Sequence, residues 1–331
     1  MMNKSAIDWC DFTWNPITGC RHTCEYCYAR RQAKRFSGDV RVNLGTSQIS
    51  TEKTERGNLH VLPQPFKSET GTTILHPAGF EPTLHEYRLP MPAQKKKPAN
   101  IFVCSMADLF GAWVPDEWIF RVFEAAEAAP WHNYLFLTKN PQRYCDLANA
   151  GKLPKRDNFW YGTTVTKKTD RIFSGSIRHH TFISIEPLTE HLEAGLGSFS
   201  SAEWIIVGAE TGNRKGKIAP KLEWIENIIE TARITHAAVL LKDSEELKAV
   251  WKGDLIQEFP KSLQHHDAPI PHCDECEHRT TEQQGQRGMT RTCEIGWEDP
   301  AYDDRNGGRH IDAKYARTSP PWCPKRNDEE A

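Results

Sequence analysis

Short apolar segments, each followed by polar residues, recur from Asn100 to Asp243. They predict strands over residues 101–104, 133–137, 159–165, 181–185, 203–207 and 237–241. Helical periodicity between several of them predicts helices over residues 115–129, from 141 onward, 170–177 and 222–232. Strands that alternate with helices pair in parallel, because each helix carries the chain back to the same edge of the sheet. With the segment before Cys20 as a first strand, about seven strands would form a parallel α/β sheet.

Two regions depart from this alternation. Residues 37–99 are rich in Gly, Pro, Thr and Lys, and they predict an irregular insertion with short strands and a helical turn near 82–89. The region after residue 250 is also rich in Gly and Pro. We therefore expect a domain at 1–250 and a loop-rich extension at 251–331.

Polar residues stand where successive predicted strands end. In parallel barrels the functional residues gather on the loops at the carboxyl ends of the strands. Any one of these residues also has a plain structural explanation, such as a helix cap or a surface charge. Their recurrence predicts one functional mouth, formed by Cys20, Asp108, Lys139, Thr163 to Thr166, Glu186, Glu210, Lys242 and Asp243.

Cys20, Cys24 and Cys27 form the pattern C-x3-C-x2-C. Three thiolates can hold three irons of a 4Fe-4S cluster and leave the fourth iron open to a ligand that is not protein. The alternative is a zinc site completed by His22 or by a distant residue, since zinc also takes sulfur and nitrogen ligands. The three cysteines therefore indicate a metal centre, and the cluster interpretation makes it catalytic.

Composition limits where such a protein works. No apolar run reaches the roughly 18 residues of a membrane span, and the first residues lack the apolar core of a signal peptide. We therefore expect a cytoplasmic protein with no membrane partner. Ten cysteines in that compartment indicate metal or redox chemistry before disulfides.

Charge is distributed unevenly although the formal net charge is only -2. Basic runs occur at residues 30–35 and 95–97, and the chain has 11 tryptophans. Basic side chains with aromatic neighbours are typical of surfaces that bind nucleic acids. A solvated helix face and core tryptophans are the structural alternative.

Several phrases resemble, in order, a phage-associated family of radical S-adenosylmethionine (SAM) enzymes, the three-Cys-motif family. They are Thr13–Cys20, Phe102–Phe110, Leu137–Pro141, Ser184–Leu188 and Val207–Gly212. The resemblance implies a partial parallel (β/α) barrel, a 4Fe-4S cluster whose open iron binds S-adenosyl-L-methionine, and a flavodoxin- or ferredoxin-type reductant. Reductive cleavage of S-adenosylmethionine would then give a 5'-deoxyadenosyl radical that abstracts hydrogen from a substrate.

The resemblance also implies roles for residues at the predicted mouth. Tyr26, directly before the last cysteine, fits the motif. Ser105 and Asp108 would receive the ammonium group of the methionine moiety, Thr163 and Thr166 the ribose hydroxyls, Glu186 the ribose or substrate, and Gly208 the adenine. Lys139, Glu210, Lys242 and Asp243 remain for the substrate.

A second cysteine group, C-x2-C-x16-C-x29-C, lies in the extension at Cys273, Cys276, Cys293 and Cys323. So short and loop-rich a segment needs a metal for stability. A second 4Fe-4S cluster and a structural zinc are both compatible with these ligands.

Two functions follow from these patterns. The first is a radical SAM enzyme that modifies or repairs a nucleic acid or nucleotide. The second is a zinc-dependent nucleic-acid-binding protein without catalysis, which leaves the polar residues at successive strand ends unexplained.

Overall fold

The computed structural model describes residues 2–175, 179–192, 199, 201–263, 279–283, 289–293 and 309–310. The chain divides into two compact units, Met1–Gln264 and His265–Ala331. The first unit contains the main sheet and the first cysteine group. No helix among the described residues is long and apolar enough to cross a membrane.

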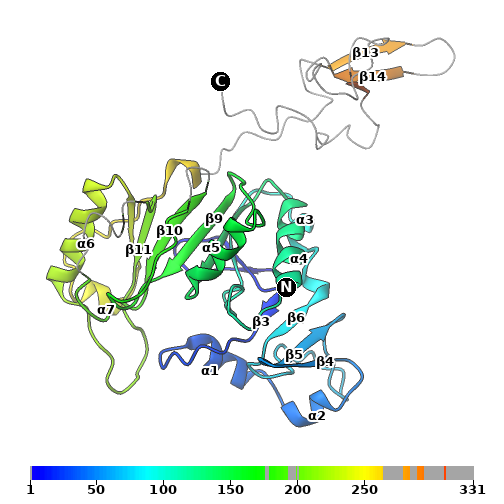
Figure 1. The fold of residues 1–331 in the computed structure, drawn as a ribbon, viewed down its shortest axis with the longest axis horizontal. Coiled ribbons are helices and arrows are strands. Elements are labelled where there is room, and N and C mark those ends of the chain that lie inside the picture. Colours follow the sequence, from blue (N-terminus) through cyan, green and yellow to red (C-terminus); the bar gives the residue numbers. More distant parts are fainter. Residues whose placement is uncertain are drawn as a thin grey trace. The chain divides into compact units, whose positions relative to one another are not determined.

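An eight-stranded sheet forms the centre of the first unit, in the order β1-β2-β7-β8-β9-β10-β11-β12. Its strands β9, β10 and β11 lie side by side in Figure 1. All neighbours from β2 to β12 are parallel, whereas β1 pairs with β2 antiparallel. The parallel α/β architecture predicted from the sequence is confirmed, and the sheet is open, with β1 and β12 at its edges. The strands are β1 Asn3–Lys4, β2 Phe12–Trp14, β7 Asn100–Val103, β8 Asn133–Thr138, β9 Phe159–Thr164, β10 His180–Ile185, β11 Trp204–Val207 and β12 Ala238–Leu241.

Both faces of this sheet are buried, which is why its strands are nearly continuous apolar runs. Alternate residues point to opposite faces. One set packs against the helices that follow the strands, as Phe136 packs with Phe123 of α4. The other set forms an aromatic cluster on the opposite face, with Trp9, Phe102, Leu135, Trp160, Phe182, Trp204, Ile206 and Leu240.

The helices beside the sheet bury one apolar stripe each. In α4, Trp118, Ile119, Val122 and Phe123 are buried, and Asp116 and Glu117 occupy the first turn, where carboxylates suit the helix dipole. The helices of this layer are α4 Asp116–Glu127, α5 Pro141–Asn149, α6 Leu222–Ile234 and the short α7 Glu245–Lys248, with a 3-10 turn at Lys261–Leu263.

Residues 37–99 contain more regular structure than the sequence predicted. A second sheet, in the order β3-β6-β5-β4, joins this insertion to the segment before Cys20. Its strands are short, and β6 pairs with β3 and β5 across long stretches of chain, so local periodicity does not reveal it. The elements here are β3 Ile17–Thr18, α1 Tyr28–Arg35, α2 Val40–Leu44, β4 Ser50–Thr54, β5 Gly57–Leu62, β6 Thr83–His85, a 3-10 turn Glu86–Arg88 and α3 Met91–Gln94.

The helix predicted over residues 170–177 is wrong for the described part, since Asp170 to Gly175 is not helical. The Asp170 carboxylate accepts from the backbone N–H of Thr166 and of Lys167, and the N–H of Phe173 donates to the Thr163 hydroxyl. Asp and Thr side chains thus bond the backbone around this segment directly, an alternative to regular structure that is typical of these residues.

The second unit contributes three short described strands. They form an antiparallel sheet of β13 Arg279–Gln283, β14 Met289–Cys293 and β15 Arg309–His310.

Gly162 in β9 tests the packing of the sheet. A Cβ at this position would lie 2.2 Å from Cζ of Phe182, so Gly162→Ala should lower the free energy of unfolding by about 1–3 kcal/mol through overpacking. Denaturant titration measures this. Gly253→Ala, where the nearest atoms are 3.5 Å away, is the control. The cost should shrink when Phe182 is also Ala, because the clash is removed, and an equal cost in both backgrounds would contradict this explanation.

Candidate functional site

Gly19 determines where Cys20 lies. Its N–H donates to the Met106 carbonyl (2.9 Å), and the N–H of Cys20 donates to the Phe80 carbonyl (3.1 Å). Gly19 has a φ of +89°, and a Cβ there would lie 2.1 Å from the Glu81 carbonyl oxygen. Only glycine fits this passage. The first cysteine is therefore fixed just beyond the carboxyl end of β7.

The other two cysteines lie where α1 begins. The N–H of Cys27 donates to the Cys24 carbonyl (3.3 Å), and the Cys27 thiol caps α1 by accepting from the N–H of Arg30 (3.4 Å). All three thiols are free and partly exposed. Burial, with smaller contributions from Asp108, Cys24 and Cys27, raises the pKa of the Cys20 thiol to about 12.

The Asp108 carboxylate connects this cysteine segment to the carboxyl ends of β7 and β8. Its Oδ2 lies 2.8 Å from His22 Nε2 and accepts from the N–H of Lys139 (3.0 Å). Its Oδ1 accepts from the Thr138 hydroxyl (2.7 Å) and from the N–H of Phe110 (3.0 Å). Asp108 is 5% exposed. A buried carboxylate with four partners holds the surrounding segments in place.

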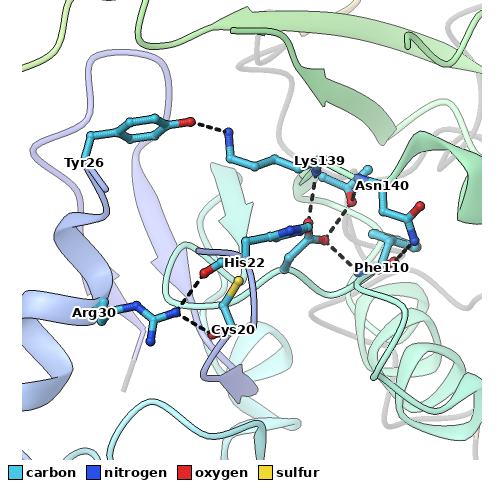
Figure 2. Close-up of polar contacts among 9 residues, drawn as sticks. Cys20, His22, Tyr26, Arg30, Phe110, Lys139 and Asn140 are labelled. Atoms are coloured by element: carbon cyan, nitrogen blue, oxygen red, sulfur yellow. Dashed lines mark hydrogen bonds and ion pairs between the residues drawn. The ribbon is translucent and has the colours of Figure 1, made fainter. Parts of the chain in front are cut away.

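Arg30 holds the same segment from the side of α1 (Figure 2). Its Nη2 donates to the carbonyls of Cys20 (3.3 Å) and His22 (2.8 Å), and the guanidinium lies 4.9 Å from the centre of the Phe80 ring. The backbone between the first two cysteines is therefore bound on both sides.

Tyr26 of the cysteine segment and Lys139, which follows β8, meet directly. Lys139 Nζ donates to the Tyr26 hydroxyl at 3.1 Å (Figure 2). Burial raises the pKa of the Tyr26 phenol, and the neighbouring ammonium of Lys139 and a hydrogen bond to Thr166 oppose this rise. Three predicted residues from three segments therefore lie together.

Ser105 is occupied by other parts of the protein. Its hydroxyl pairs with the Asn15 side chain (3.1 and 3.2 Å), and its carbonyl accepts from the Tyr28 hydroxyl (2.8 Å). These contacts fasten the first turn of α1 to the end of β7.

Glu186, Gly208 and Lys242 come together from β10, β11 and β12. Lys242 Nζ bonds the Glu186 carboxylate. A Cβ on Gly208 would lie 3.0 Å from Cδ of Lys242 and 3.1 Å from Cγ of Glu186. Gly208 thus makes room for this ion pair within the structure.

The loop after β11 reaches the cysteine segment through Arg214. Its guanidinium binds both carboxylate oxygens of Glu210 and also Glu25 Oε2 (3.2 Å). The hydrogen bonds from Arg214 lower the pKa of Glu210. Glu25 stands between Cys24 and Cys27, so this loop and the cysteine segment are directly linked.

Two predicted residues lie away from this arrangement. Thr163 is fully buried and its hydroxyl accepts from the N–H of Phe173 (3.2 Å). The Asp243 carboxylate pairs with Lys248, and its N–H donates to Asp8.

Of the second cysteine group, Cys293 ends β14, opposite Arg279 and Arg309 in the register, while Cys273, Cys276 and Cys323 lie outside the described residues.

Sequence reasoning did not find the structural roles of Arg30 and Arg214. Arg30 stood only as one member of a basic run, although its place three residues after Cys27 is a signal for a contact within the first turn. Arg214 lies in an irregular loop, and no periodic pattern there points to Glu25.

Several solved structures of spore photoproduct lyase are similar to this chain at a low level. The structure complexed with dinucleoside spore photoproduct has a TM-score of 0.37 and 8% identity, covering 90% of this chain and 72% of that chain. A doubly substituted mutant of the same enzyme, with bound AdoMet and dinucleoside spore photoproduct, has a TM-score of 0.35 and 8% identity over the same shares. No curated protein matches.

One family model covers most of the chain. It carries the description "Protein of unknown function (DUF5131)" and matches residues 4–294, which include the main sheet, the insertion and the first cysteine group. The chain therefore belongs to the DUF5131 family.

Proposed function

We propose that this protein is a radical SAM enzyme that holds a 4Fe-4S cluster on Cys20, Cys24 and Cys27. The observation that carries the proposal is the placement of three free, partly exposed thiols at the carboxyl ends of a parallel sheet. The collinear phrases from Thr13 to Gly212 support kinship with the phage-associated three-Cys-motif family. These phrases are a second line of support, from the sequence, beside the position of the three thiols.

The residues present fit such a cluster in their chemistry. Thiolates are the usual ligands of iron-sulfur clusters, and N–H donors to sulfur, such as Arg30 to Cys27, are among the groups that tune them. No three His, Cys, Asp or Glu side chains in the described part of the chain converge on one ion. A cube does not require this, because each thiolate bonds a different iron.

When bound and reduced by an external flavodoxin- or ferredoxin-type donor, a cluster of this kind supplies the electron that cleaves S-adenosylmethionine to methionine and a 5'-deoxyadenosyl radical. The chain itself orients the reactants and excludes water. Asp108, Arg30 and Ser105 are committed to protein partners, so they support the cysteine segment. Tyr26, Thr166 and Glu186 are also bonded, to Lys139, Asp170 and Lys242, but they are partly exposed, and we keep them as the candidates for nucleotide contacts.

A nucleic acid or nucleotide is the substrate class we propose, for modification or repair. The basic helix α1 begins directly after Cys27, which caps it, and contains no acidic residue. Cations next to a catalytic mouth attract phosphates. The extension would bind a second metal centre, either a 4Fe-4S cluster or zinc, on Cys273, Cys276, Cys293 and Cys323.

Replacing Cys24 by Ala should abolish cleavage of S-adenosylmethionine and remove about four irons per chain, because a cluster on two remaining thiolates is not retained. Anaerobic reconstitution with iron and sulfide, reduction with dithionite, and quantification of 5'-deoxyadenosine measure this. Cys145→Ala, a free and half-buried cysteine on α5, is the control and should keep both properties. Full cleavage in the Cys24 variant would refute the proposal.

Replacing Asp108 by Asn should loosen the cysteine segment. An amide keeps one acceptor oxygen but turns an N–H2 group toward protein donors, at a cost of about 1–3 kcal/mol. We expect a lower melting temperature and fewer irons and sulfides per chain after reconstitution. Asp116→Asn, at the half-exposed partner of Arg143, is the matched control. Wild-type iron content together with wild-type melting in the Asp108 variant would contradict the holding role.

The second metal can be identified in a variant with Ser at positions 20, 24 and 27. Metal and sulfide analysis should still find a bound metal, since the four cysteines of the extension are unchanged. Iron with sulfide would identify a second cluster, and zinc without sulfide a structural site. A metal-free protein would contradict the presence of a second centre.

A further inference from the structure

The sequence has two basic runs, and the structure separates them. Residues 30–35 form most of α1, which follows the cysteine segment and is tied by Tyr28 to Ser105, just beyond the carboxyl end of β7. Residues 95–97 precede β7 at its other end, where the Lys95 carbonyl accepts from Trp131 Nε1 (2.8 Å) just before β8. Only the first run therefore lies beside the candidate mouth.

The loop after β11 adds further cations to the surface of α1. A Cβ on Gly212 would lie 3.9 Å from Arg31 Nη2, and Arg31 contributes to the lowered pKa of Glu210. Arg214 of the same loop bonds Glu25, two residues before the cap of α1. Residues 212–217 contain three cations and no carboxylate. Two segments far apart in the sequence thus build one basic surface.

Three carboxylates near this surface already form ion pairs. Arg214 forms ion pairs with Glu210 and Glu25, and Lys217 forms one with Glu246 at 3.0 Å. A second set of cations is exposed and has no carboxylate within ion-pair distance among the described residues. We call this set the mouth patch: Arg31, Lys34, Arg35 and Lys215.

Exposed aromatic rings stand at both ends of the basic helix. Tyr28 is 50% exposed and Phe36 is 41% exposed. The Arg35 guanidinium lies 5.4 Å from the centre of the Phe36 ring. Rings of this kind stack on bases, and guanidinium groups beside them bind phosphates.

We propose that the mouth patch binds the phosphate backbone of a nucleic acid beside the three cysteines, and that residues 95–97 do not take part. That the bound nucleic acid is also the substrate rests on the proposed function. The binding itself is independent of any cofactor. The charge complementarity of unpaired cations and phosphates carries it.

Two charge reversals of equal size test the proposal. The variant Arg31→Glu/Lys34→Glu changes the mouth patch, and Lys96→Glu/Lys97→Glu makes the same change in net charge at the other end of the sheet. Fluorescence anisotropy of the full chain, without iron, would measure binding of labelled single-stranded DNA, duplex DNA and single-stranded RNA across ~50–200 mM salt.

We expect the mouth-patch variant to bind at least one of these nucleic acids about tenfold more weakly or worse, with the slope of log K against log salt reduced by about 1.5–2. The Lys96/Lys97 variant should stay within about twofold of wild type. Equal losses in both variants, no binding by the wild type, or equal competition by polyglutamate would overturn the proposal. Melting temperatures confirm that both variants fold.

Failure of this inference differs from failure of the proposed function. A reconstituted protein that forms 5'-deoxyadenosine but loses no affinity in the mouth-patch variant overturns the surface alone. A chain that binds through the patch but forms no 5'-deoxyadenosine leaves the surface intact and refutes the enzyme.

Discussion

The candidate site depends on one buried carboxylate. Asp108 follows β7 and accepts hydrogen bonds from segments that follow β7 and β8, while it also contacts His22 between the first two cysteines. Because a buried carboxylate must keep its partners, these segments are fixed relative to one another. Arg30 completes the support from α1 by binding the carbonyls on either side of Arg21. The thiols themselves remain free for a ligand.

The parallel sheet was predictable from the sequence because its strands are buried on both faces and read as apolar runs with helices between them. The strand before Cys20 and the helices α4, α5 and α6 follow from the same reasoning. The sheet of the insertion was not predictable in detail, since the strand pairs β3-β6 and β5-β6 join distant short segments. The helix expected from Asp170 is absent from the described residues 170–175, where Asp170 and Thr163 side chains bond the backbone instead.

The site shows the same division. Strand-end position predicted that Glu186 and Lys242 lie at one mouth, and these two side chains do bond each other. Tyr26 was selected from its place in the cysteine motif, and its contact with Lys139 was not predicted. Sequence position could not show whether a polar side chain is already hydrogen-bonded within the protein. Asp108 and Ser105 are at the expected strand end, yet protein donors and acceptors occupy them. Likewise, the basic runs at residues 30–35 and 95–97 are similar in sequence, but they lie at opposite ends of β7 in the structure.

The central claim is that a cluster on Cys20, Cys24 and Cys27 leaves one iron open for S-adenosylmethionine. Electron paramagnetic resonance of the reconstituted, reduced chain before and after addition of S-adenosylmethionine tests it most directly. The account predicts an iron-sulfur signal whose line shape changes when the nucleotide binds, and this response should disappear when the three cysteines are replaced. A signal indifferent to S-adenosylmethionine, or a colourless protein that binds only zinc, would contradict it.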